Sequence, residues 1–304
     1  MSSSSHGSPV KAILYALVAN GAIAIAKSIA AFFTGSGSML AEAIHSFADC
    51  GNQILLFIGL KQSARPPDAQ HPLGYGKASY FWSFVVAIML FSLGGLFSIY
   101  EGVHKLTASE QVTHAWIALT VLGVSVVIEL ASLLGCLKEI SHIRGERGFG
   151  EWLRHTRSAE LVVVLGEDLA AIIGLLLAFA FVALAVLTGN PVYDAIGSIS
   201  IGVVLIVISV FVAIRMKALI VGRSADPDIV AAIEQTIAGD EAIEKLFNAI
   251  TLQLGPSIML AAKIKLHPGV PMELAVRSIN ALEKRIKERF PEVQWCFIEP
   301  DIED

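Results

Sequence analysis

The strongest constraint on this 304-residue chain is a series of long apolar segments. A helix that crosses the hydrocarbon core of a membrane needs about 20 mostly apolar residues. Six segments meet this requirement, namely Ala12–Thr34, Met39–Leu60, Tyr80–Val103, Ala115–Leu137, Ala159–Leu187 and Tyr193–Met216. Each is too long for a strand of a membrane barrel, which needs only about 9–11 residues. The sequence therefore predicts an α-helical membrane protein with six transmembrane helices.

Charge divides the chain into two parts. Residues 1–222 carry 13 Lys and Arg against 13 Asp and Glu, whereas residues 223–304 carry 9 against 14. Only 16% of all residues are charged, compared with about 25% in a soluble domain. This composition excludes a soluble globular protein and a disordered chain, and three cysteines are too few for a disulfide scaffold. We expect a transmembrane domain over residues 1–222 and a soluble domain over residues 223–304.

The connecting segments predict how the chain is oriented. Residues 61–78 and 138–158 hold most of the Lys and Arg between the apolar segments, whereas residues 35–38 and 188–192 hold none. Positive charge marks the cytoplasmic side of a membrane. Both termini are therefore expected in the cytoplasm, and the chain is expected in a bacterial cytoplasmic (inner) membrane.

The pattern of the last 80 residues predicts a small α+β domain. Residues 229–238 and 272–290 have helical apolar spacing, and residues 247–254, 259–266 and 293–298 are typical of strands. The predicted order is αββαβ, with helices on one face of a sheet. A domain of this size has a modest core, so pairing with a second copy would stabilise it.

Ionisable residues within the apolar segments are the candidate functional groups. Each costs about 2.5–3.5 kcal/mol at the middle of a membrane on insertion scales, so a functional role is expected. The candidates are Lys27, Glu42, His45, Asp49, Glu129, Glu167 and Asp168.

Helical spacing brings several of these groups together. His45 and Asp49 are one turn apart on the same helix face as Glu42. An imidazole and a carboxylate at this spacing can chelate a divalent cation such as Zn²⁺. Asp49, Asp168 and Glu129 lie about 20, 15 and 21 Å along their helices, near the middle of a ~30 Å core. Lys27 reaches a similar depth and is a natural counter-charge for Glu42 or Glu129.

Four motifs of the sequence resemble the cation diffusion facilitator family, most closely its zinc transporter 9-like branch. They are Thr34–Ser36 with Met39–Asn52, the loop Asp68–Lys77, Glu167–Ala171, and Asp194–Gly202. The resemblance implies a homodimer of six-span subunits with a ferredoxin-like cytoplasmic domain. It also implies the exchange of cytoplasmic Zn²⁺, or a similar divalent cation, for protons at a site that includes His45, Asp49 and Asp168.

The sequence departs from the family pattern at three places. Val164 stands four residues before Asp168, where the family has a ligand, so Glu167, Glu42 or water must complete the set. The cytoplasmic domain lacks the family's His cluster, so it is expected to dimerise without a binuclear zinc site. In the loop, Asp68 and His71 match a second family metal site, but Tyr75 replaces a His.

The predicted function is efflux of a divalent cation by alternating access, with protons as the counter-substrate. Mn²⁺ or Fe²⁺ in place of Zn²⁺ is one alternative, because carboxylates also suit these ions. A monovalent cation/proton antiporter, which would not need His45, is a second, and a membrane-anchored metal sensor is a third. No nucleophile–base pair, phosphate-binding loop or nucleic-acid-binding patch is evident. We therefore expect neither an enzyme nor a resident cofactor, and membrane lipid, metal ions and a second copy as partners.

Overall fold

The computed structural model describes residues 9–108 and 114–303, with side chains over residues 20–107 and 114–303. The chain forms two compact units. One comprises Met1–Ile58, Trp82–Gly145 and Glu160–Arg215, and the other comprises Gly59–Phe81, Glu146–Ala159 and Met216–Asp304. The expected domain boundary at residue 222 stays a prediction.

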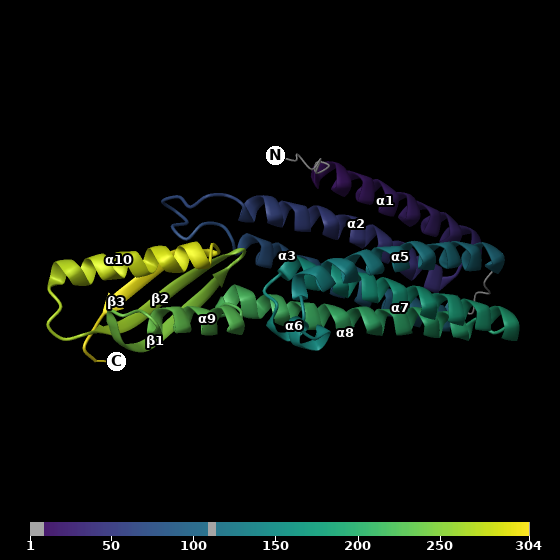
Figure 1. Cartoon of the computed structure of the whole chain (residues 1–304). Helices are drawn as coiled ribbons and strands as arrows, with labels where there is room; N and C mark the ends of the chain where they lie inside the picture. Colours follow the sequence, from purple (N-terminus) through teal and green to yellow (C-terminus); the bar gives the residue numbers. More distant parts are fainter. Residues whose placement is uncertain (1–8, 109–113, 304) are drawn as a thin grey trace. The chain divides into compact units, whose positions relative to one another are not determined.

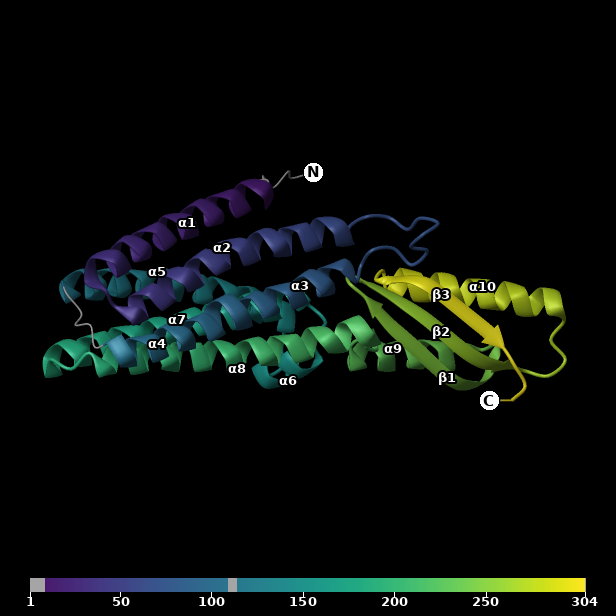
Figure 2. The same cartoon turned by 180° about the vertical axis from the view of Figure 1, so that it is seen from behind.

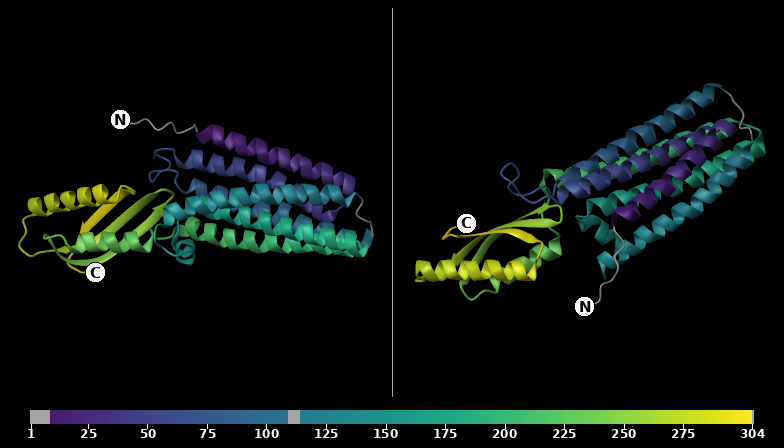
Figure 3. Two further views of the ribbon diagram at one scale, coloured as in Figure 1. Left: turned by 45° about the vertical axis from the view of Figure 1, so that its right-hand side comes forward. Right: turned by 90° about the horizontal axis from the view of Figure 1, so that it is seen from above.

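The first unit is a bundle of long helices that run alongside one another (Figure 1, Figure 3). Its helices are contributed by α1 (Pro9–Thr34), α2 (Gly37–Ser63), α3 (Ala78–Met89), η1 (Leu90–Leu96), α4 (Phe97–Ala108), α5 (Ala115–Arg144), α7 (Ala159–Thr188) and α8 (Val192–Gly222). Every segment predicted to span a membrane is helical, and the third is interrupted by the π-helical turns of η1. A short helix, α6 (Phe149–His155), precedes α7 and belongs to the second unit.

Four helical segments of the described chain are long and apolar enough to cross a membrane. They are Ala78–Thr107, α5, α7 and the segment that begins with α8. The described apolar part of α1, Asn20–Thr34, is shorter than a span. Helix α2 is absent from this set because polar residues, among them His45, Asp49, Asn52 and Gln53, lower its hydropathy. The fold class is confirmed, and the count of six spans stays a prediction for α1 and α2.

Glycines bring η1 and α8 into backbone contact. A Cβ atom added at Gly202 would lie 2.6 Å from the carbonyl oxygen of Gly95, and one added at Gly95 would lie 2.5 Å from Ile206 Cγ1. No side chain larger than hydrogen fits at either position. This contact fixes the third predicted span against the sixth.

A buried carboxylate joins the start of α2 to the start of α8. Asp194 is 1% exposed, and its Oδ2 accepts a hydrogen bond of 2.6 Å from the backbone N–H of Gly37. Its Oδ1 accepts one of 2.6 Å from Ser36 Oγ. The first N–H groups of a helix lack partners within the helix, and a carboxylate from elsewhere can satisfy them. Asp194 therefore caps α2 from α8.

The second unit contains a three-stranded sheet with two helices on one face (Figure 2). Its elements are α9 (Pro227–Ala238), β1 (Ile243–Leu254), β2 (Ser257–Leu266), α10 (Met272–Arg289) and β3 (Val293–Pro300). Strand β2 is central, antiparallel to β1 and parallel to β3. The predicted αββαβ order is confirmed. Its core includes Ile233, Ile237, Leu260, Leu282 and Ile286.

The two predicted cytoplasmic loops contact this domain within the second unit. Gly255 in the β1–β2 turn donates its N–H to Tyr80 Oη at 2.9 Å, and Gly76 packs against the same turn. From the other loop, Arg147 Nη1 donates to Asp226 Oδ2 at 2.7 Å. Burial is the largest single influence on the pKa of Asp226 and would raise it, but the hydrogen bonds from Arg147 and the N–H of Asp228, together with the charges of Arg147 and Arg157, hold this pKa below its ordinary value.

Candidate metal site

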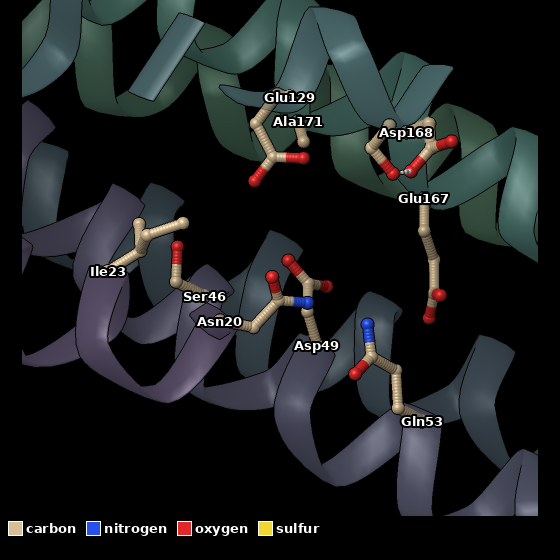
Figure 4. A pocket seen from close by; sticks show the side chains of 10 residues that line it. Asn20, Ile23, Ser46, Asp49, Gln53, Glu129, Glu167, Asp168 and Ala171 are labelled. Carbon is tan, nitrogen blue, oxygen red and sulfur yellow. Dashed lines mark hydrogen bonds between the residues drawn. The ribbon is translucent and has the colours of Figure 1, made fainter. Parts of the chain in front are cut away.

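A small polar cavity lies inside the helical bundle. Its volume is about 40 Å³, enough for an ion with a water molecule. Four carboxyl groups line it, Asp49 from α2, Glu129 from α5, and Glu167 with Asp168 from α7 (Figure 4). The polar residues Asn20, Ser46, Gln53 and Ser132 complete most of the wall. The convergence predicted for Asp49, Glu129 and Asp168 is therefore present, with Glu167 beside them.

The carboxyl groups approach the cavity from facing helices. In Figure 4, Asp49 and Glu129 point toward each other from α2 and α5, and Glu167 extends toward Gln53. Asp168 Oδ1 accepts a hydrogen bond of 3.2 Å from Ser132 Oγ. Among the described residues, Asp49 Oδ1, Glu167 Oε1 and Asp168 Oδ2 are buried without a hydrogen-bond partner. Buried oxygens of this kind are costly unless a cation or proton satisfies them.

His45 lies beside the cavity rather than in its wall. Its ring is 1% exposed, and Nε2 is 3.6 Å from Asp49 Oδ2, which is beyond a hydrogen bond. Neither ring nitrogen has a hydrogen-bond partner in the described part of the chain. The imidazole is therefore available as a ligand next to Asp49. Over residues 9–108 and 114–303, however, no three His, Cys, Asp or Glu side chains are clustered closely enough to hold a metal.

Two of the predicted charged residues pair with each other instead of lining the cavity. Lys27 Nζ is 3.1 Å from Glu42 Oε2, and both residues are 0% exposed. Glu42 and Glu129 were the two partners predicted for Lys27, and in the structure Lys27 pairs with Glu42. Of the three groups proposed to replace the ligand missing at Val164, Glu167 lines the cavity and Glu42 does not.

Asn20, Gln53 and Ser132 line the cavity but were not singled out from the sequence. Two of them follow from helical spacing, because Gln53 is four residues after Asp49 and Ser132 three after Glu129. No comparable signal identifies Asn20, since its place depends on how α1 packs.

The loop candidate, Asp68 with His71, lies in the second unit and is exposed. His71 Nδ1 is 3.6 Å from Asp68 Oδ1, and Tyr75 Oη donates to Asp68 Oδ2 at 2.7 Å. Asp68 Oδ1 also accepts from the backbone N–H groups of Gln70 and His71. The hydrogen bond from Tyr75 is the main cause of a lowered pKa at Asp68. Both carboxylate oxygens are thus used within the loop, and metal binding there stays a prediction.

A bundle of long apolar helices is typical of a membrane protein, and a cavity lined by four carboxyl groups is chemically suited to a cation. Residues 13–218 match the family model of the cation efflux transmembrane domain. The chain belongs to the cation diffusion facilitator family, as the sequence motifs predicted.

Curated relatives agree with this membership. The chain is 33% identical over 279 residues to the mitochondrial proton-coupled zinc antiporter SLC30A9 of Xenopus laevis, covering 91% of this chain and 49% of that relative. It is 34% identical over 225 residues to metal tolerance protein C4 of Arabidopsis thaliana, and the match covers 73% of this chain and 49% of that relative. An uncharacterized transporter of Methanocaldococcus jannaschii is 22% identical, and the match covers 97% of this chain and 98% of that relative. The chain thus spans about half the length of the first two relatives.

Proposed function

We propose that this chain is a secondary active transporter that exports a divalent cation, foremost Zn²⁺, in exchange for protons. The observation that carries the proposal is the polar cavity in the bundle with four carboxyl groups, three of which hold buried oxygens without a hydrogen-bond partner among the described residues. The name of its SLC30A9 relative supports zinc as the substrate and protons as the counter-substrate.

In this mechanism Asp49, Asp168 and His45 are the principal ligands, and Glu167 completes the set. Carboxylates and imidazole bind a metal only when deprotonated, so binding the cation releases protons and reprotonation expels it. The side chains turn toward one another around the cation, because they do not form a closed cluster without it. The imidazole of His45 favours Zn²⁺ over Mn²⁺, which prefers oxygen ligands alone.

The bundle exposes the cavity to one side of the membrane at a time by alternating access. Both termini and the αββαβ domain lie in the cytoplasm, because the basic loops mark that side. The membrane is a bacterial cytoplasmic membrane or the corresponding organelle membrane, since the curated SLC30A9 relatives are mitochondrial.

The transporter acts as a homodimer through the sheet face that α9 and α10 leave uncovered. The rows Ile250–Ala261–Phe297 and Leu252–Met259–Trp295 run across this outer sheet face. Ile250 and Phe297 are 62% and 57% exposed. The next row holds Lys263 beside Glu299, and Lys263 Nζ is 2.9 Å from Asp301 Oδ2 of the same chain, so charged groups border the apolar rows.

The test uses the full chain in proteoliposomes with a zinc indicator and a pH-sensitive dye in the lumen. Zinc added outside is expected to enter while the lumenal pH rises. Asp49→Asn and Asp168→Asn should each lower the rate at least roughly tenfold, because each removes a charged ligand. Glu288→Gln, at an exposed position of α10, is the matched control. Unchanged transport in either Asp variant contradicts the site, and zinc entry without a dye response contradicts proton exchange.

A further inference from the structure

The bundle buries a full positive charge one side chain away from the cavity. Lys27 Nζ donates to Glu42 Oε2 at 3.1 Å and to Ser46 Oγ at 2.8 Å. Ser46 in turn lines the cavity. A buried ion pair is costly to desolvate, and apolar residues of the same size often serve stability as well or better. The pair therefore calls for a functional explanation.

The position of Glu42 shows what the pair does to the cavity. Its Oε2 is held by Lys27, and its Oε1 lies against α7 where a Cβ atom at Gly174 would be only 2.5 Å away. Glu42 is on the same face of α2 as Asp49 but does not line the cavity. Lys27 thus neutralises a fifth carboxylate and holds it apart from the four in the cavity wall.

We propose that Lys27 is a positioning residue that sets the cation affinity of the cavity by neutralising Glu42 and fixing both Glu42 and Ser46. The inference rests on the proposed function, since it concerns how tightly the transported cation binds. Charges in a poorly solvated interior interact strongly over several ångströms. An unpaired carboxylate here would hold a divalent cation too tightly for release, and an unpaired ammonium would repel it.

If charge decides the affinity, neutralising Lys27 and neutralising Glu42 should change the KM for Zn²⁺ in opposite directions. Lys27→Met leaves Glu42 unpaired, so the KM for Zn²⁺ should fall roughly tenfold and kcat should fall as release slows. Glu42→Gln leaves Lys27 unpaired, so KM should rise roughly tenfold. The double variant Lys27→Met/Glu42→Gln has no net change in charge, and its KM should return to within about threefold of the native value. Lys27→Arg should preserve KM.

The experiment measures the initial rate of Zn²⁺ entry against Zn²⁺ concentration for the full chain in proteoliposomes. Each rate is corrected for the amount of folded protein found by size-exclusion chromatography. Opposite shifts of KM in the single variants, cancelled in the double variant, support the proposal. If the pair only stabilises the fold, all three variants lose folded protein and the remainder keeps the native KM. That result, or a double variant no closer to native than the worse single variant, overturns the proposal.

Zinc transport by the native protein distinguishes a failure of this inference from a failure of the proposed function. If the native protein moves no zinc, the proposed function fails. If it moves zinc normally but the variants shift KM in the same direction, only the role of Lys27 fails.

Discussion

At the scale of single residues, Asp226 in the second unit serves two elements at once. Asp226 both caps α9, through a 3.0 Å bond from the N–H of Asp228, and accepts from Arg147. The Arg147 side chain is 30% exposed and that of Asp226 15%. This pair therefore contributes a measurable but modest share of stability, and its contribution depends on pH.

Asp226→Asn should keep the cap and lose the charge, lowering the unfolding free energy at pH 7 by about 1 kcal/mol. The pKa of Asp226 is lowered in the folded state, so its stabilisation is present above the unfolded pKa of about 3.9 and is lost as pH falls through the folded value. Denaturant unfolding of the detergent-solubilised chain should show the native–variant difference shrinking below about pH 4. A difference that is constant from pH 7 to pH 3 would contradict this assignment.

At the scale of elements, apolar length and helical period predicted the helices but not their partners. The spacing of Asp49 and Gln53 places them on one face of α2, and local pattern determines this. The pairing of Lys27 with Glu42 rather than Glu129 depends on how α1 rotates against α2 and α5. The capping of α2 by Asp194 joins positions more than 150 residues apart. Neither contact has a local signal, because packing between helices decides both.

The close contact between η1 and α8 should make the bundle sensitive to a larger side chain at Gly202. Gly202→Ala places a methyl group 2.6 Å from a backbone oxygen that cannot move aside, so we expect destabilisation of about 1–3 kcal/mol. Gly123→Ala on α5 is the control, because a Cβ atom there has no neighbour within 4 Å. Thermal unfolding in detergent measures both. Equal midpoints for the two variants would show that the close contact is absent.

At the scale of the whole molecule, the outer sheet face is where a second copy is expected. Alternation along the strands predicted the αββαβ domain, since residues toward the helices are apolar and buried. The same alternation leaves apolar residues such as Ile250 and Phe297 on the opposite face, where the described part of the chain leaves them exposed. Such a face indicates a partner of matching shape.

Phe297→Glu should therefore convert the dimer to a monomer, with a dissociation constant raised by at least roughly 30-fold, because it places a charge at an exposed position of an apolar row. Val276→Glu is the matched control, since Val276 is 47% exposed on α10, away from the outer sheet face. Light scattering in detergent over a range of protein concentrations gives the mass. A Phe297→Glu protein that keeps the mass of two chains at every concentration would exclude this face as the interface.

The bond between Asp194 and the start of α2 also constrains how the bundle can move. Both carboxylate oxygens are engaged, so the first turns of α2 and α8 behave as a common pivot. A second contact, between Gly95 of η1 and Gly202, holds α8 farther along its length. If the bundle rearranges to admit a cation to Asp49, we therefore expect the displacement of α2 to increase with distance from Gly37. The C-terminal half of α2 should then move most.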